Sequence, residues 1–418
     1  MDSVVITGLG FITSIGNDRR EVVSSLRSMK NGIETYLPFS DSKIPVKVMG
    51  TIKGFETSGT DQEDWTFPDR YRINRSFLRS LSPHALYGYC AVVQALEEAG
   101  LSLDAISDER TGLYTASAGS TSFLVHHLNY LNEFGAERSQ PKAIVASIAG
   151  TLNFNLASQF RIKGSTCGFV SACASSAHAL GLAFEEIIAG RQERMLVVGA
   201  EDGNRDCILP FASMRALSTN PDPETASRPF DRQRDGFVGT GGAVCLILEN
   251  EETARARGGS ILARMLGYGQ ASDGYSAVLP EAEGDGLRRA MEQALRRADL
   301  SVSDVDYINA HAPSTPLGDL AEIRALRRVF GERHSPAISS TKSQTGHALS
   351  MASALEAGLS ILAMNAGMIP GTAHLEEPDE EAVGLDLVTQ PREGAIETFL
   401  SNSSGFGGAN VCLAFGKP

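Results

Sequence analysis

Short apolar segments that alternate with amphipathic segments constrain the fold of this chain more than any other feature. The apolar segments are rich in β-branched residues, as buried strands are, and comprise VVITGLG at 4–10, MLVVGAED at 195–202, AVCLILEN at 243–250 and DYINAH at 306–311. The amphipathic segments have helical spacing and cover residues 84–100, 175–190, 286–299 and 318–331. This alternation predicts an α/β fold.

The length and charge of the chain limit its possible functions. Its 418 residues correspond to two or three folding units of about 150 residues, and the charged, glycine-containing stretch at 252–265 is the best candidate for a seam. The net charge of −13 would repel nucleic acid and anionic membrane surfaces. No apolar run reaches the ~18 residues that span a bilayer, and no basic leader opens the chain. We therefore expect a cytoplasmic protein without nucleic-acid or membrane partners.

Several familiar site motifs are absent from the sequence. The six cysteines form no CxxC pair, which argues against a zinc ribbon and against a disulfide framework. The glycine-rich TGLGFITSIG has Thr13 where a dinucleotide-binding loop needs its third glycine. A GxSxG elbow is also missing, so a serine hydrolase is disfavoured.

Cys173 is the best candidate nucleophile. It lies in VSACASSAHALG, between an apolar strand and the predicted start of a helix rich in small residues. Backbone N–H groups and the dipole at a helix start favour the thiolate, which is the reactive form of cysteine. A buried structural cysteine remains the alternative at this point.

Two histidines and a glycine-rich segment complete a candidate site. His311 directly follows the strand-like DVDYINA, and His347 lies in a loop, SSTKSQTGHALS, that leads into a helix. Together with Cys173 they form a candidate Cys/His/His constellation. The glycines of SNSSGFGGANVCLAF, residues 401–415, would let backbone N–H groups approach an oxyanion, although a simple hairpin would need the same glycines.

These segments together resemble the β-ketoacyl-acyl-carrier-protein synthases, elongating condensing enzymes of the thiolase superfamily. The resemblance covers essentially the whole chain and is carried by VITGLGFITSIGN, VSACASSAHA, ALSTNPDPETASRPFDRQRDGFV, YINAHAPSTPLGD, SPAISSTKSQTGH and SNSSGFGGAN. It implies an α/β, thiolase-like, five-layer αβαβα fold. The fold would be built from two similar halves, residues 1–255 with the nucleophile and 256–418 with the two histidines.

The resemblance also assigns roles to single residues. Cys173 matches the acyl-accepting nucleophile, and His311 and His347 match the histidines that bind the malonyl thioester and assist its decarboxylation. Lys342 and Glu322 match two members of one buried network. The oxyanion hole would consist of the N–H groups of Cys173 and Phe406, with Phe406 and Asp273 on two gating loops. Substrate would contact Thr315, Ser404, Gly405 and Gly407, and residues 112–123 would line the acyl pocket.

The implied reaction is a decarboxylative Claisen condensation of an acyl group on Cys173 with malonyl-acyl-carrier protein, in fatty-acid elongation. The partners would be acyl-carrier protein and its malonyl and acyl thioesters, carried on phosphopantetheine, and the site itself would need no cofactor or metal. The family implies a homodimer, and a heterodimer with a related subunit is the alternative. A non-catalytic chain-length subunit is disfavoured, because this chain keeps Cys173 and both histidines.

Three departures from the family pattern bear on the substrate. The usual HGTxT is HAPST here, so Ala312 and Pro313 replace glycine and threonine, while Thr315 is kept. The usual SFGFGG is SSGFGG, so Ser404 replaces a phenylalanine and would widen the space behind the gate. More polar and bulkier residues follow His347 than is usual. These changes make a specialised type II polyketide or polyene pathway the alternative setting.

Overall fold

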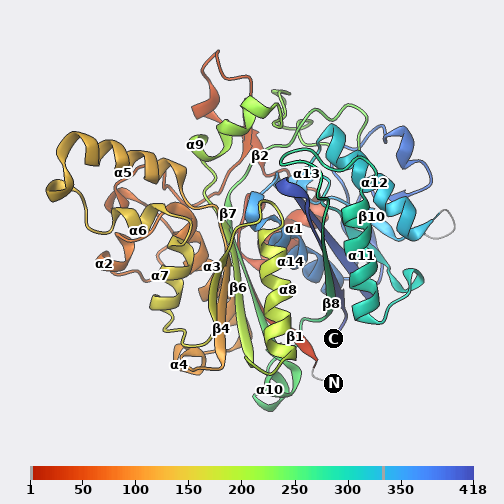
Figure 1. Ribbon diagram of the computed structural model, residues 1–418, viewed down its shortest axis with the longest axis horizontal. Helices are drawn as coiled ribbons and strands as arrows, with labels where there is room; N and C mark the ends of the chain where they lie inside the picture. The colour runs from red at the N-terminus through yellow and green to blue at the C-terminus, as the bar shows by residue number, and fades with distance from the viewer. Residues whose placement is uncertain (1–2, 332–334) are drawn as a thin grey trace.

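The computed structural model describes residues 3–331 and 335–418, and most of its strands form one sheet (Figure 1). The strands are β1 Val4–Ile12, β2 Ile33–Thr35, β3 Val48–Gly50, β4 Thr111–Ala116, β5 Thr166–Phe169, β6 Arg194–Glu201, β7 Gly242–Asn250, β8 Ala263–Ser272, β9 Tyr307–Asn309, β10 Ala337–Ser339, β11 Met368–Ile369, β12 Asp386–Leu387, β13 Arg392–Glu393, β14 Thr398–Gly405 and β15 Ala409–Gly416. The α-helices are α1 Arg19–Ser28, α2 Arg75–Leu78, α3 Pro83–Ala99, α4 Leu103–Ile106, α5 Thr121–Phe134, α6 Ala143–Ser147, α7 Thr151–Gln159, α8 Ser175–Ile188, α9 Arg205–Ile208, α10 Glu251–Ala256, α11 Asp285–Ala298, α12 Pro316–Phe330, α13 Lys342–Thr345 and α14 Ala352–Asn365. The predicted α/β alternation is confirmed.

The large sheet repeats one topology in its two halves. Its 11 strands follow the order β12-β10-β9-β14-β15-β8-β1-β7-β6-β4-β5. In the first half, β1 pairs antiparallel with β7 and β7 with β6, while β6, β4 and β5 are parallel. In the second half, β8, β15, β14, β9 and β10 repeat this pattern in the same chain order. The prediction of two similar halves is therefore confirmed.

The two halves are joined edge to edge through β1 and β8. Val4, Val5 and Ile6 pair antiparallel with Met265, Arg264 and Ala263. This short ladder makes the sheets of both halves continuous, which sequence patterns did not indicate. The chain crosses from one half to the other through α10, where the sequence suggested a seam, and the boundary between residues 255 and 256 stays a prediction.

Helices cover both outer faces of the folded sheet and fill the space between its halves. Helix α3 packs on β1, β7 and β6, and α11 packs on β8 and β15 and against α12. Helices α8 and α14 contact strands of both halves, and Figure 1 shows α8 between β6 and β8. The order is helix, sheet, helix, sheet, helix, which agrees with the expected five layers. None of the helices in the described segments is long and apolar enough to cross a membrane.

Candidate active site

Cys173 lies between β5 and α8, two residues before the helix begins, as the sequence predicts. The chain turns sharply there, because Ala172 has a left-handed φ of 50°. The N–H of Ser171 donates to Ser175 Oγ (2.8 Å), and this Oγ donates to the carbonyl of Ala172 (2.6 Å). These bonds fix the turn that carries the thiol.

His347 is in direct contact with the nucleophile. Its Nε2 lies 3.0 Å from Sγ of Cys173. The backbone N–H of His347 donates to Val238 O (2.7 Å), and the Phe237 ring meets the imidazole edge to face at 5.2 Å between centroids. The segment of Phe237 and Val238 thus contacts both the backbone and the ring of His347.

His311 stands beside the first histidine at the end of the adjoining strand. It follows β9 by two residues, so the strand is shorter than the predicted 306–311. The two imidazole rings are 5.3 Å apart at 85°. The Nδ1 atoms of both histidines are buried without a hydrogen-bond partner among the described residues. The predicted Cys/His/His constellation is therefore assembled in space.

Burial controls the protonation of these three groups. Burial raises the pKa of Cys173 to about 12, although the nearby Lys342 ammonium acts in the opposite direction. Burial, together with the positive charge of Lys342, lowers the pKa values of His311 and His347 well below 6.5. The resting site thus holds a thiol and two neutral imidazoles. Desolvation of the sulfur thus opposes the thiolate, which the helix start favours.

Lys342 and Glu322 meet at the backbone of His311, on opposite sides. Nζ of Lys342 donates to the His311 carbonyl, while the Glu322 carboxylate accepts the N–H groups of His311 (3.0 Å) and Ala312 (2.7 Å). Asn402 Nδ2 also donates to Glu322 at 3.0 Å. Both predicted network members are confirmed as buried neighbours of the histidine, but they do not pair with each other.

The ion-pair partner of Lys342 is Glu356, which sequence reasoning missed. This carboxylate of α14 contacts Nζ directly, and both side chains are almost completely buried. The available signal was a single acidic residue in the otherwise uncharged helix ASALEAGLSILAMN. A buried helix tolerates such a charge only when it is paired.

The glycine-rich turn between β14 and β15 lies against the nucleophile. A Cβ atom on Gly405 would lie 3.0 Å from the backbone nitrogen of Cys173, so glycine permits this approach. The ring of the next residue, Phe406, packs at 6.2 Å from Phe211. The segment forms the turn of a hairpin, which was one of the two sequence interpretations, and the same turn borders the site. The oxyanion-hole assignment for Cys173 and Phe406 stays a prediction.

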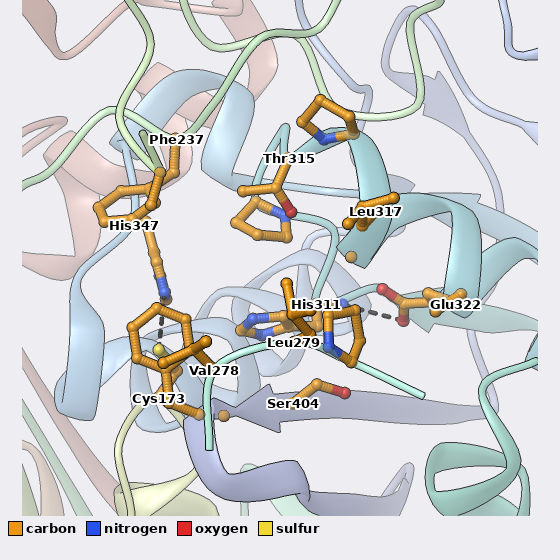
Figure 2. Close-up of a pocket in the computed structure, with 18 of the residues that line it drawn as sticks. Cys173, Phe237, Val278, Leu279, His311, Thr315, Leu317, Glu322, His347 and Ser404 are labelled. Carbon is orange, nitrogen blue, oxygen red and sulfur yellow. Dashed lines mark hydrogen bonds between the residues drawn. The ribbon is translucent and has the colours of Figure 1, made fainter. Parts of the chain in front are cut away.

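A cavity of about 350 Å³ opens onto the three reactive side chains (Figure 2). Asp273, Thr315, Ser404, Gly405 and Phe406 line it. The departures Pro313 and Ser404 both face this space, whereas Gly407 lies outside it, exposed, with its N–H donated to Ala277 O. Residues 112–123 do not border this cavity, so their place along the acyl pocket stays a prediction.

Donor atoms of Cys173, His311 and His347 lie within 4.8 Å of one another, which is close enough to surround a metal ion. The contact between Cys173 Sγ and His347 Nε2 and the packing of the two imidazole rings account for this proximity without a metal. We therefore base no step on a metal.

Comparisons with known proteins show what the whole chain is similar to. The chain matches the family model of the β-ketoacyl synthase N-terminal domain over residues 1–254 and that of the C-terminal domain over 262–376. It is 40% identical to 3-oxoacyl-[acyl-carrier-protein] synthase 1 of Haemophilus influenzae, covering 99% of both chains, and 39% identical to its Escherichia coli K12 counterpart, covering 100% of this chain and 99% of the other. A crystal structure of a β-ketoacyl synthase from Burkholderia phymatum superposes with a TM-score of 0.90 at 33% identity, over 100% of both chains. A type II polyketide ketosynthase solved with its acyl-carrier protein superposes with a TM-score of 0.90 at 26% identity, also over 100% of both chains.

Proposed function

The chain belongs to the β-ketoacyl synthase family, and on that premise we propose that it extends acyl chains in fatty-acid synthesis. It condenses an acyl group held on Cys173 with malonyl-acyl-carrier protein and releases CO₂ and 3-oxoacyl-acyl-carrier protein. The observation that carries this proposal is the contact of 3.0 Å between Cys173 Sγ and His347 Nε2, with His311 beside it at the cavity wall.

The first half-reaction loads Cys173. Its sulfur attacks the thioester carbonyl carbon of the acyl carrier, and the bond from that carbon to the phosphopantetheine sulfur breaks. Because burial keeps Cys173 protonated at rest, the thiol proton must leave as the new bond forms, and His347 is in contact to pass it to the departing sulfur. The N–H groups of Cys173 and Phe406 are the donors that we assign to the oxyanion.

The second half-reaction generates a carbanion without a strong base. The malonyl C–C bond breaks to release CO₂, and the resulting negative charge spreads onto the thioester oxygen. Neutral His311 and His347 can each donate a hydrogen bond to that oxygen, and their lowered pKa values keep them neutral near pH 7. The malonyl carbon then attacks the acyl carbonyl, and the sulfur of Cys173 leaves as a thiolate, which takes up one proton from solvent to restore the resting thiol. Loss of CO₂ drives the step, so the proposed reaction needs no cofactor.

Acyl-carrier protein supplies both substrates in this proposal. The exposed rim of the cavity includes Arg215, Leu317 and Met214, which offer one cation and two apolar side chains to a docking protein that delivers a long arm. We assign Thr315, which lines the cavity, to that arm.

We further propose that two copies of the chain form a homodimer through β5. This strand ends the sheet, and its only partner among the described strands is β4. An unpaired edge invites pairing with a second strand. Val170, directly after β5, is 68% exposed, and Ile144 and Phe154 of the neighbouring helices are also exposed. Val170→Glu should give a monomer by light scattering, whereas Leu37→Glu, at another exposed apolar position, should not. A dimer that survives Val170→Glu would contradict this interface, and mixed dimers with a related subunit would favour the heterodimer.

A ketosynthase of a specialised type II polyketide or polyene pathway is the second candidate. The observation that favours it is that Ser404 and Pro313 both border the cavity, where they change its width and polarity. Elongation and this alternative use the same chemistry on different acyl groups.

One experiment tests the function and separates the two settings. The protein is incubated with a panel of linear, branched and polyunsaturated acyl-carrier thioesters, and its intact mass and peptides are analysed. We expect a single acyl group on Cys173, none in Cys173→Ala and normal loading in Cys207→Ala. Loading on another cysteine would refute the nucleophile assignment. Preference for saturated linear chains supports fatty-acid elongation, and preference for polyunsaturated chains supports the alternative.

A further inference from the structure

Ser404 begins a chain of hydrogen bonds behind the site. It lies in β14 directly opposite Asn410 of β15, and its Oγ donates to Asn410 Oδ1 at 2.7 Å. Nδ2 of Asn410 donates to Asp273 Oδ1 (2.7 Å) and to the carbonyl of Gly408 (3.0 Å). Both the oxygen and the nitrogen of the buried Asn410 amide therefore have hydrogen-bond partners, and the Ser404 hydroxyl is the donor to its oxygen.

Asp273 extends this chain of bonds to the neighbouring loop. Its backbone N–H donates to Gly408 O (2.9 Å), and its Oδ2 accepts the N–H of Glu281 (3.2 Å). The carboxylate lies directly against the start of α11, where a Cβ on Gly286 would be 2.0 Å from Oδ1. Asp273 thus has little room to move.

The bonded residues enclose the turn that carries Phe406. Ser404 and Asn410 are the two legs of this turn, and Gly407 at its tip donates to Ala277 O (2.8 Å) of the loop that follows Asp273. Ser404 and His311 both line the cavity, and Figure 2 draws Ser404 below His311 in this view. A change at Ser404 can therefore reach Phe406 through the legs of the turn.

We propose that Ser404 is a positioning residue: through Asn410 and Asp273, its hydroxyl holds the turn that carries Phe406, whose N–H we assign to the oxyanion. This inference rests on the proposed acyl transfer to Cys173. The phenylalanine usual at this position in the family would fill the space but could not donate a hydrogen bond. In this chain a hydrogen bond replaces the support that a larger side chain would give by packing.

The test compares Ser404→Ala, which loses the hydroxyl, with Ser404→Thr, which keeps it. Loading of Cys173 by an acyl-carrier thioester is followed in a single turnover, and decarboxylation of malonyl-carrier protein is followed without an acyl group. We expect Ser404→Ala to load about two- to tenfold more slowly, as the loss of one neutral hydrogen bond implies. Decarboxylation should fall by a smaller factor than loading, because the donors that we assign to its developing negative charge are the histidines and not the Phe406 turn. Ser404→Thr should load like the parent.

A double-mutant cycle checks the route through Asn410. In an Asn410→Ala background, Ser404→Ala should have no further effect on loading, since the link is already cut. Should Ser404→Ala fail to fold, Ser404→Cys keeps the size and weakens the donor.

Parental loading rates in Ser404→Ala, equal losses of loading and decarboxylation, or additive effects in the cycle would each overturn the inference. Loading by the parent itself is measured in the same series. Its absence would refute the proposed function instead.

Discussion

Replacing Gly405 by alanine should separate the oxyanion turn from the nucleophile. The added Cβ would lie 3.0 Å from Cys173 N and Ser171 O and 3.2 Å from Ala174 N. All three are backbone atoms that cannot rotate away, and ordinary contacts are about 3.5–4.0 Å, so the turn must retreat by roughly half an ångström. Removing one oxyanion donor costs about 10²- to 10³-fold in rate. We therefore expect acylation of Cys173 to slow about 10²-fold.

The assay is single-turnover loading measured by rapid quench and intact mass, with thermal unfolding in parallel. Gly407→Ala is the matched control in the same turn. Its φ of 79° strains any side chain by about 1–2 kcal/mol, but a Cβ there would meet no heavy atom within 4 Å. We expect that variant to lose stability and to load within a few-fold of the parent. Parental loading in Gly405→Ala, or equal loss in both variants, would refute the argument that this close approach positions an oxyanion donor.

Three other perturbations test the proton chemistry and the buried charges. His347→Ala should slow nucleophile loading and malonyl decarboxylation, whereas His311→Ala should slow mainly decarboxylation, because only His347 contacts the sulfur; equal loading rates would contradict this. Lys342→Met should lower the free energy of unfolding in urea by about 3–5 kcal/mol, because it leaves Glu356 unpaired. Adding Glu356→Leu should recover most of that stability. If Lys342→Met lost activity but no stability, the pairing argument would be wrong. Burial raises the pKa of Glu201 from 4.5 to about 7, so the folded protein binds this proton more tightly and loses stability as pH rises from 4.5 to 7. Glu201→Gln should therefore gain about 2–3 kcal/mol relative to the parent between pH 5 and pH 8, and a constant difference would show that Glu201 does not titrate in this range.

The sequence predicted the reactive residues better than it predicted their environment. Cys173, His311 and His347 stand in local segments whose glycines, small residues and strand ends can be recognised without tertiary structure. The pairing of Lys342 with Glu356 depends on how α14 packs beneath the site, so spacing along the chain carried only a weak signal for it. The protonation state of Cys173 likewise depends on burial by distant segments.

The architecture was predictable in part. Alternating strands and helices indicated the α/β class, but the two similar halves followed from the family resemblance and not from periodicity. The pairing of β1 with β8 could not be foreseen, because only the short ends at residues 4–6 and 263–265 pair, and three residues carry no pattern that specifies a partner strand or a register. His311 was expected at the end of a strand and instead follows β9 by two residues, where Glu322 holds its backbone.

The seam between the halves has a consequence for how the activity is encoded. The nucleophile precedes the connection from α10 to β8, and both histidines follow it, while none of residues 257–262 borders the cavity. The covalent connection thus lies away from the cavity, whereas α8 and α14 pack against each other between the halves and link the parts of the site. We expect that cleavage of the backbone within residues 257–262 would give two fragments, each with only part of the site. These fragments should be active only when they associate, because the site is formed between the two halves.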